Sequence, residues 1–191
     1  MNKKLFTILE FIGVPIIYLI ASVLHFVYDW SGGSVLSILF GAVNESVWEH
    51  VKIFAVAFTL WTAIELLAVK PPFKKFVVAK TISLYFLSLS IIVFFYAYNL
   101  FTSKPILWLD LLSSFVFTLL SQTISYYLTT KENTITDYFP VAVMLIMLYF
   151  MMFFSFTVFP PKADLFKDPV TCMYGIIGKN IDEGAIFLDK T

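Results

Sequence analysis

The sequence predicts an all-α polytopic membrane bundle of about five transmembrane helices, and two observations carry that prediction. Of the 191 residues, 60% are hydrophobic and 14% are charged, whereas ordinary globular domains are about half apolar and about a quarter charged. The apolar residues also fall into separate runs of about 20, the length an α-helix needs to cross a hydrocarbon core about 30 Å thick. A helix satisfies its own backbone hydrogen bonds in lipid.

Each run predicts one helix, and a shorter apolar run lies between the first two. Because the first run is long and lacks a small-residue cleavage site, we expect a retained helix and not a signal peptide. The segment Ser34–Val43 is too short to cross and follows Gly32 and Gly33, which indicates a re-entrant or interfacial element. The expected spans are Phe6–Tyr28, Val47–Val69, Phe76–Leu100, Ile106–Leu128 and Tyr138–Phe159.

The domain organisation follows from a change of character at Pro160. Residues 1–159 form the predicted bundle, and residues 160–191 form an extramembrane tail in which prolines stop helix formation. Apolar pairs such as Leu165 and Phe166 stand among charged residues there. We expect the tail to pack on the outer face of the bundle, and a mobile end lying on lipid is the alternative.

The distribution of lysines predicts the orientation. Cytoplasmic loops of membrane proteins carry an excess of lysine and arginine, and the stretch Asp29–Ser46 has no lysine. The N-terminus is therefore expected in the cytoplasm and, after five crossings, the tail outside. The lysines that decide this are Lys3, Lys4, Lys70, Lys74, Lys75 and Lys80.

Charge restricts the expected partners. The formal net charge is zero and all thirteen basic residues are lysines. The chain therefore has no guanidinium group that could bind a phosphate through two parallel hydrogen bonds, and nucleic acid is not an expected partner. The lipid bilayer is the expected partner, with a small-molecule, lipid or peptide ligand. The single Cys172 cannot form an internal disulfide.

Candidate functional residues are the ionisable ones, because a charge in a membrane helix is costly and normally faces protein or water. His25 and Asp29 are four residues apart, as are Glu45 and Glu49, so each pair shares a helix face. The topology places one polar slab near the outer interface. Its members are His25, Asp29, Glu45, Glu49, His50, Lys52, Asn99 and Asp110.

Three interpretations of this slab stay open. In the first, it binds a divalent metal such as zinc through His25 and Glu49, with Asp29, Glu45 and His50 as further candidates. In the second, Glu49, His25 and His50 perform acid–base or transport chemistry without metal. The third is a structural network.

In the structural network, Asn44 caps the second helix, His25 bonds Asp29, and Glu49 pairs with Lys52. A second polar set, Glu10 and Glu65 with Lys80 as counter-ion, is interpreted as structural. An aromatic belt is expected at the outer level. Its members would be Trp30, Trp48 and Trp108.

Three sequence blocks resemble a family of small multipass bacterial proteins of unknown function. They are the run from His25 to Gly33, the run from Val43 to Lys52, and the tail from Pro160 to Thr171. The resemblance covers nearly the whole chain and implies the cytoplasmic membrane of a Gram-positive bacterium, but no activity. Cys172 stands where a small residue, Gly above all, is expected. Five helices are also similar to translocator-protein architecture, whose motifs are absent.

The function is accordingly expected to be one of three kinds. A metal-bound or carboxylate-activated water would hydrolyse a lipid or peptide in the membrane. A small transporter or ligand-binding protein would need a polar path from the slab toward Gln122. A non-catalytic partner subunit would use the slab only for folding or assembly.

Overall fold

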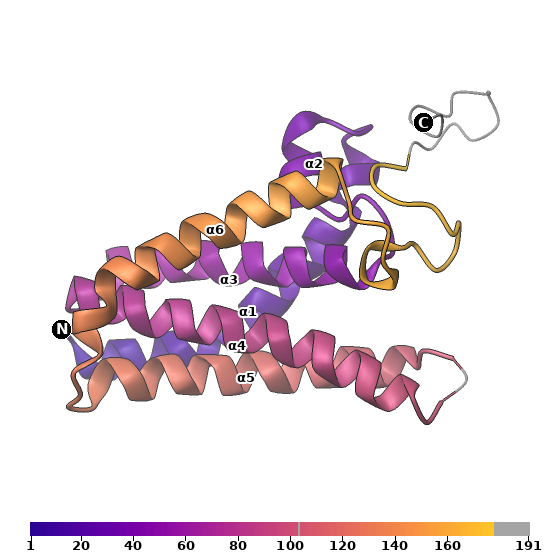
Figure 1. The fold of residues 1–191 in the computed structure, drawn as a ribbon. Coiled ribbons are helices and arrows are strands. Elements are labelled where there is room, and N and C mark those ends of the chain that lie inside the picture. Colours follow the sequence, from indigo (N-terminus) through magenta and orange to yellow (C-terminus); the bar gives the residue numbers. More distant parts are fainter. Residues whose placement is uncertain (103, 178–191) are drawn as a thin grey trace.

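Five long helices lie lengthwise in a bundle (Figure 1) in the computed structural model, which describes residues 1–102 and 104–177. All five helical segments are long and apolar enough to span a membrane, the last together with the short 3₁₀ turn η1 (Ile135–Tyr138) before it. The predicted fold class is thus confirmed. The helices are α1 (Lys3–Trp30), α3 (Val47–Val69), α4 (Phe73–Asn99), α5 (Leu107–Thr130) and α6 (Phe139–Val158).

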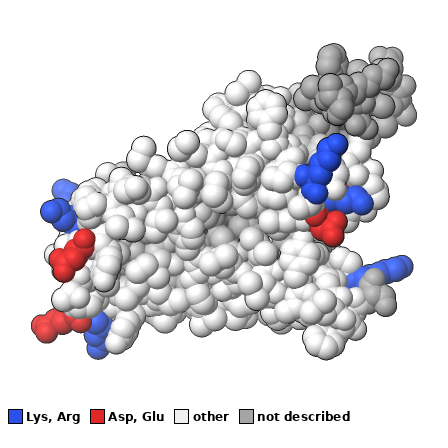
Figure 2. Space-filling view, in the orientation of Figure 1, with Lys and Arg blue, Asp and Glu red and all other residues white. Residues whose placement is uncertain are grey.

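On one face of the bundle, the charged side chains lie at the two ends. On the face in Figure 2, coloured Lys, Asp and Glu side chains lie at either end, and the described surface between them is uncharged. Large apolar side chains such as Leu19, Leu67 and Met144 are more than half exposed. Apolar surface of this extent, framed by charge, fits helices that face lipid.

A tight turn reverses the chain after α1. Gly32 and Gly33 have φ values of 63° and 77°, a left-handed backbone that glycine adopts without steric cost. The six-residue helix α2 (Val35–Phe40) follows, and the Ala42 N–H then donates to the Leu24 carbonyl of α1. The predicted short element is therefore a helix packed against the bundle; its position in the membrane stays a prediction.

Aromatic side chains pack α3 against α6. The Trp48 and Phe153 rings stack with centroids 4.4 Å apart, and Phe166 packs on the same indole at 4.9 Å. Trp48 is therefore buried, and its assignment to an aromatic belt was wrong because its ring fills the α3–α6 interface. Trp30 and Trp108 are exposed.

The described part of the tail, residues 160–177, packs on the bundle end that carries α2, called the α2 end (Figure 1). It contains the 3₁₀ turn η2 (Asp164–Phe166), which contacts α3. Cys172 has a φ of 60°, so the residue stands in the left-handed backbone that glycine favours. Residues 178–191 of the predicted tail lie outside the described residues, and its extramembrane location stays a prediction.

Candidate metal centre

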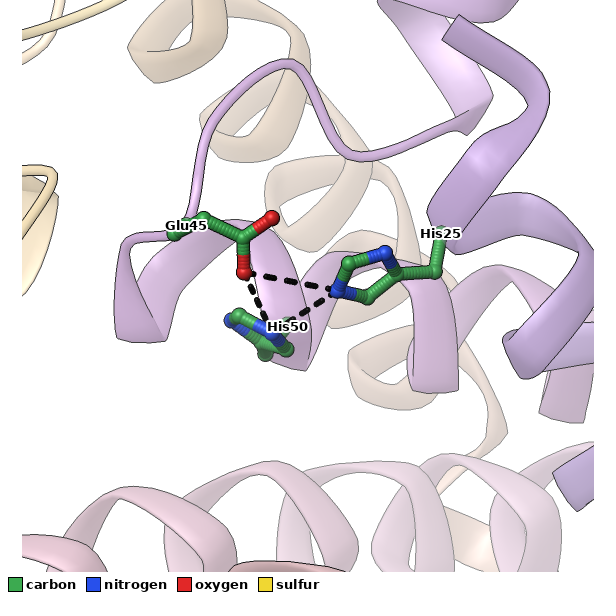
Figure 3. Close-up of side chains that lie close together, drawn as sticks. All are labelled: His25, Glu45 and His50. Atoms are coloured by element: carbon green, nitrogen blue, oxygen red, sulfur yellow. Dashed lines mark hydrogen bonds and ion pairs between the residues drawn. The ribbon is translucent and has the colours of Figure 1, made fainter. Parts of the chain in front are cut away.

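Two histidines and one glutamate converge at the α2 end (Figure 3). His25 comes from α1, Glu45 from the loop before α3, and His50 from the first turn of α3. The two imidazole Nε2 atoms lie 3.2 Å apart, and each lies 3.5 Å from Glu45 Oε2. One carboxylate oxygen and two ring nitrogens thus form a nearly equilateral triangle.

The start of α3 places Glu45 and His50 beside each other. Ser46 is the N-cap, and its hydroxyl accepts the Glu49 N–H, so Glu45 is left just outside the helix. The prediction that Asn44 caps this helix was wrong. Asn44 instead accepts the Ser46 N–H through its amide oxygen and donates to the Gly175 carbonyl of the tail.

The orientation of the His50 ring favours a cation. Its Nδ1 lies 2.9 Å from the Ser46 carbonyl, which can only accept, so Nδ1 carries the proton in the neutral ring. Nε2 then presents its lone pair to the triangle. His25 Nδ1 is buried and has no hydrogen-bond partner among the described residues. His25 Nε2 lies beside two acceptor atoms, His50 Nε2 and Glu45 Oε2, and can itself carry one proton at most.

Electrostatics keep Glu45 ionised. Its hydrogen bond with His25, helped by the charges of His50 and His25, outweighs partial burial and holds the pKa of the Glu45 carboxyl below its ordinary value. The side chain is about half exposed, so water reaches it. The triangle therefore contains a carboxylate at neutral pH.

A cavity of about 340 Å³ adjoins the triangle. Its lining includes His25 and Glu45, together with Asp168, Thr171 and other residues of the tail. Asp29, proposed above as a metal ligand, lies on this cavity wall and outside the triangle. The cavity therefore leaves room for a ligand beside His25 and Glu45.

Glu49 does not belong to this cluster. Successive helix residues point about 100° apart, so Glu49 faces α6 while its neighbour His50 faces α1. Its carboxylate is 2.6 Å from Lys52 Nζ and accepts from the Thr157 hydroxyl and the Val43 N–H. The pairing with Lys52 expected in the structural network is present. Glu49 therefore acts here as a positioning residue for the loop that carries Glu45.

The other residues of the predicted slab lie outside the triangle as well, although the charge of Asp110 interacts with that of His50. Asp110 accepts the Tyr98 hydroxyl at 2.7 Å, and Asn99 donates to the Phe95 carbonyl of its own helix. Both belong to the α4–α5 turn region. Thr171 was not predicted as a cavity residue, because the tail carries no local signal that would bring it to the same cavity as His25.

The triangle fits the size of a tetrahedral metal site. Zinc bonds of about 2.0–2.2 Å to nitrogen and oxygen place tetrahedral ligand atoms roughly 3.3–3.6 Å apart. The three observed separations are 3.2, 3.5 and 3.5 Å. Three protein ligands would leave the fourth position of such a site open.

The fold and the cluster together define a helical bundle with the apolar spans of a multipass membrane protein and a two-histidine, one-carboxylate site at one end. The chain belongs to the family of unknown function DUF6512, which matches residues 2–176. Comparisons with curated proteins and with solved structures gave no match.

Proposed function

We propose that His25, Glu45 and His50 bind one divalent metal ion, zinc being the ion that suits them best. The observation that carries this proposal is the triangle itself, whose edges are close to those of a tetrahedral site. Imidazole and carboxylate are ordinary zinc ligands. The Ser46 carbonyl supports the site, because a backbone acceptor fixes the tautomer of the ligating His50.

The chemistry that this site supports best is hydrolysis of a peptide or a lipid ester. A metal with three protein ligands and an open position lowers the pKa of bound water and polarises a carbonyl. Asp29 shares the cavity with His25 and is the carboxylate to which we assign proton transfer. Asp29, Glu45 and Asp168 make the cavity acidic, which disfavours phosphate anions and favours neutral carbonyl substrates.

The proposed location is a bacterial cytoplasmic membrane, with the N-terminus in the cytoplasm and the metal centre outside. The lysine bias supports this orientation. Lys3 begins α1, Lys70 lies between α3 and α4, and Lys75 lies in the first turn of α4, at the end of the bundle opposite to α2. Substrates would then reach the cavity from the external face.

Metal content is the decisive measurement. The protein, purified in detergent with a tag that contains no histidine, is stripped with a chelator, loaded with zinc and analysed for elements. We expect one zinc per chain, and loss of zinc in His25→Ala, Glu45→Ala and His50→Ala. Asp137→Asn is the control, since Asp137 is exposed and lies in η1, at the end of the bundle opposite to α2. Absence of stoichiometric zinc, or unchanged zinc in the three variants, overturns the proposal.

Hydrolysis needs a separate test. Loaded protein is incubated with quenched fluorescent peptides and with ester lipids in mixed micelles. Asp29→Asn should keep the zinc and lose turnover, because it changes the proposed proton acceptor and leaves the triangle intact. A variant that turns over as fast as the wild type would remove Asp29 from the mechanism. Zinc binding without turnover of either class would leave a metal-binding protein and refute the hydrolase.

A further inference from the structure

A second charged cluster lies inside the bundle, away from the metal centre. Lys80 of α4 lies between Glu10 of α1 and Glu65 of α3, with Nζ 3.1 Å from Glu10 Oε2 and 2.5 Å from Glu65 Oε2. Each of the three side chains is at most 4% exposed. α5 adds the uncharged Gln122 and Ser125. Four helices thus enclose two carboxyl groups and one ammonium group.

The charges of this cluster do not balance. If both carboxyl groups were ionised, Lys80 would neutralise one and leave one negative charge buried among membrane-spanning helices. An unpaired buried charge is strongly destabilising, and a carboxyl group in that position takes up a proton instead. The pair Glu49–Lys52 is the contrasting case, because one carboxylate there faces one ammonium group.

Hydrogen bonding decides which carboxyl group takes the proton. Glu65 Oε1 faces the Trp61 indole N–H at 3.1 Å and the Gln122 amide at 3.4 Å. Both groups can only donate here, so Oε1 must accept from both and carries no proton. Glu65 Oε2 is 2.5 Å from Lys80 Nζ, an ammonium group with no lone pair that could accept a proton. Glu65 is therefore the ionised partner.

Glu10 has a different neighbour. Its Oε1 lies 2.8 Å from the Ser125 hydroxyl, and a hydroxyl can either donate or accept. A proton on Glu10 Oε1 can therefore be donated to Ser125 Oγ, while Oε2 still accepts from Lys80. Glu10 is the member of the pair that the surroundings allow to be neutral.

We propose that Glu10 is a proton-binding site, protonated at neutral pH, in which the proton on Oε1 is donated to Ser125 and Lys80 balances Glu65. The site is independent of the proposed metal centre. Buried ionisable residues with a counter-ion are the components from which proton relays in membrane proteins are built. Loss of this proton would leave two ionised carboxylates, Glu10 and Glu65, around the single ammonium group of Lys80.

Infrared spectroscopy tests this directly. A protonated carboxyl group absorbs in the acid carbonyl region and shifts in D₂O, and difference spectra against variants assign the band. The wild type should show one such band that disappears in Glu10→Gln. It should also disappear in Glu65→Gln, because Glu10 then becomes the single partner of Lys80. Lys80→Met should double the band, because both carboxyl groups must then be neutral.

Two further variants sharpen the result. Glu49→Gln should leave the band unchanged, because Glu49 is already balanced by Lys52. Ser125→Ala should keep the band and shift its frequency, because the hydrogen-bond acceptor of the proton is lost. Identical spectra of wild type and Glu10→Gln overturn the proposal. If a higher melting temperature in sodium than in choline salts accompanies identical spectra, a sodium ion balances the charge and no proton is bound.

Discussion

The Nε2 atoms of His25 and His50 lie 3.2 Å apart, although the two residues come from different helices. Because a neutral His50 donates its Nδ1 proton to the Ser46 carbonyl, two neutral imidazoles and Glu45 direct three possible ligand atoms into one small space, with at most one proton, on His25 Nε2, among them. A proton satisfies one contact of this triangle, whereas a divalent cation satisfies all three. This geometry predicts that protons and metal ions compete for the same three ligand atoms.

Metal affinity should therefore fall steeply with acidification. A ligating imidazole must be neutral, so protons compete with the metal for His25 and His50. Glu45 does not add to this effect near neutral pH, because its pKa lies below the ordinary value and the carboxylate stays ionised. Where both imidazoles are protonated and Glu45 is still ionised, the dissociation constant should rise about 100-fold for each pH unit of acidification, tenfold for each imidazole. Competition titration with a chromogenic chelator measures it.

The variant Glu45→Gln separates the roles of carboxylate and imidazole. It should bind zinc more weakly at every pH, since an amide is a poorer ligand than a carboxylate. The steepness of the pH dependence should stay that of the wild type, because both imidazoles remain. A flatter dependence in Glu45→Gln would contradict this assignment and make Glu45 the titrating ligand.

The bundle was predictable because hydrophobic length alone decides which segments can cross a membrane. The span Val47–Val69 was predicted with the bounds that α3 has. The start of α4 was placed at Phe76, whereas the helix begins at Phe73, because Pro72 can precede a helix without interrupting it. Trp48 was misplaced because hydropathy does not tell a lipid-facing ring from one packed on Phe153.

The site was predictable only in part. The sequence pointed to His25, Glu45 and His50, because ionisable groups are conspicuous in an apolar chain. It also favoured Glu49 as a ligand, because helix geometry gives the angle between Glu49 and His50 but not which neighbouring helix each of them faces. The contacts of Asp168 with Glu45 link residues 123 apart, and no local pattern encodes such a pairing.

Breaking the Glu49–Lys52 pair should destabilise the fold. Lys52→Met leaves the buried Glu49 carboxylate without its counter-charge, and loss of one partner of a buried pair costs roughly 3–5 kcal/mol. It also removes the hydrogen bonds from Lys52 to the Ile38 carbonyl and the Thr157 hydroxyl. Unfolding by a denaturing detergent measures the free energy.

The double variant Glu49→Gln with Lys52→Met tests the electrostatic cause. Without the carboxylate, most of the loss should be recovered, because no uncompensated charge remains. Lys162→Met is the control, since Lys162 is exposed, and should change the free energy of unfolding by less than about 0.5 kcal/mol. A double variant as unstable as Lys52→Met would assign the effect to lost packing.

Asp168→Asn should loosen the tail from the loop that carries Glu45. The buried Asp168 carboxylate accepts the N–H groups of Val170 and Thr171 through Oδ1 and of Glu45 through Oδ2, and replacing Oδ2 by an amide nitrogen removes the acceptor for Glu45. Faster hydrogen exchange at Glu45 and weaker zinc binding are expected, with a local loss of about 1–3 kcal/mol. The exposed Asp164→Asn should change neither quantity. Unaltered exchange at Glu45 in Asp168→Asn would show that the tail does not hold this loop.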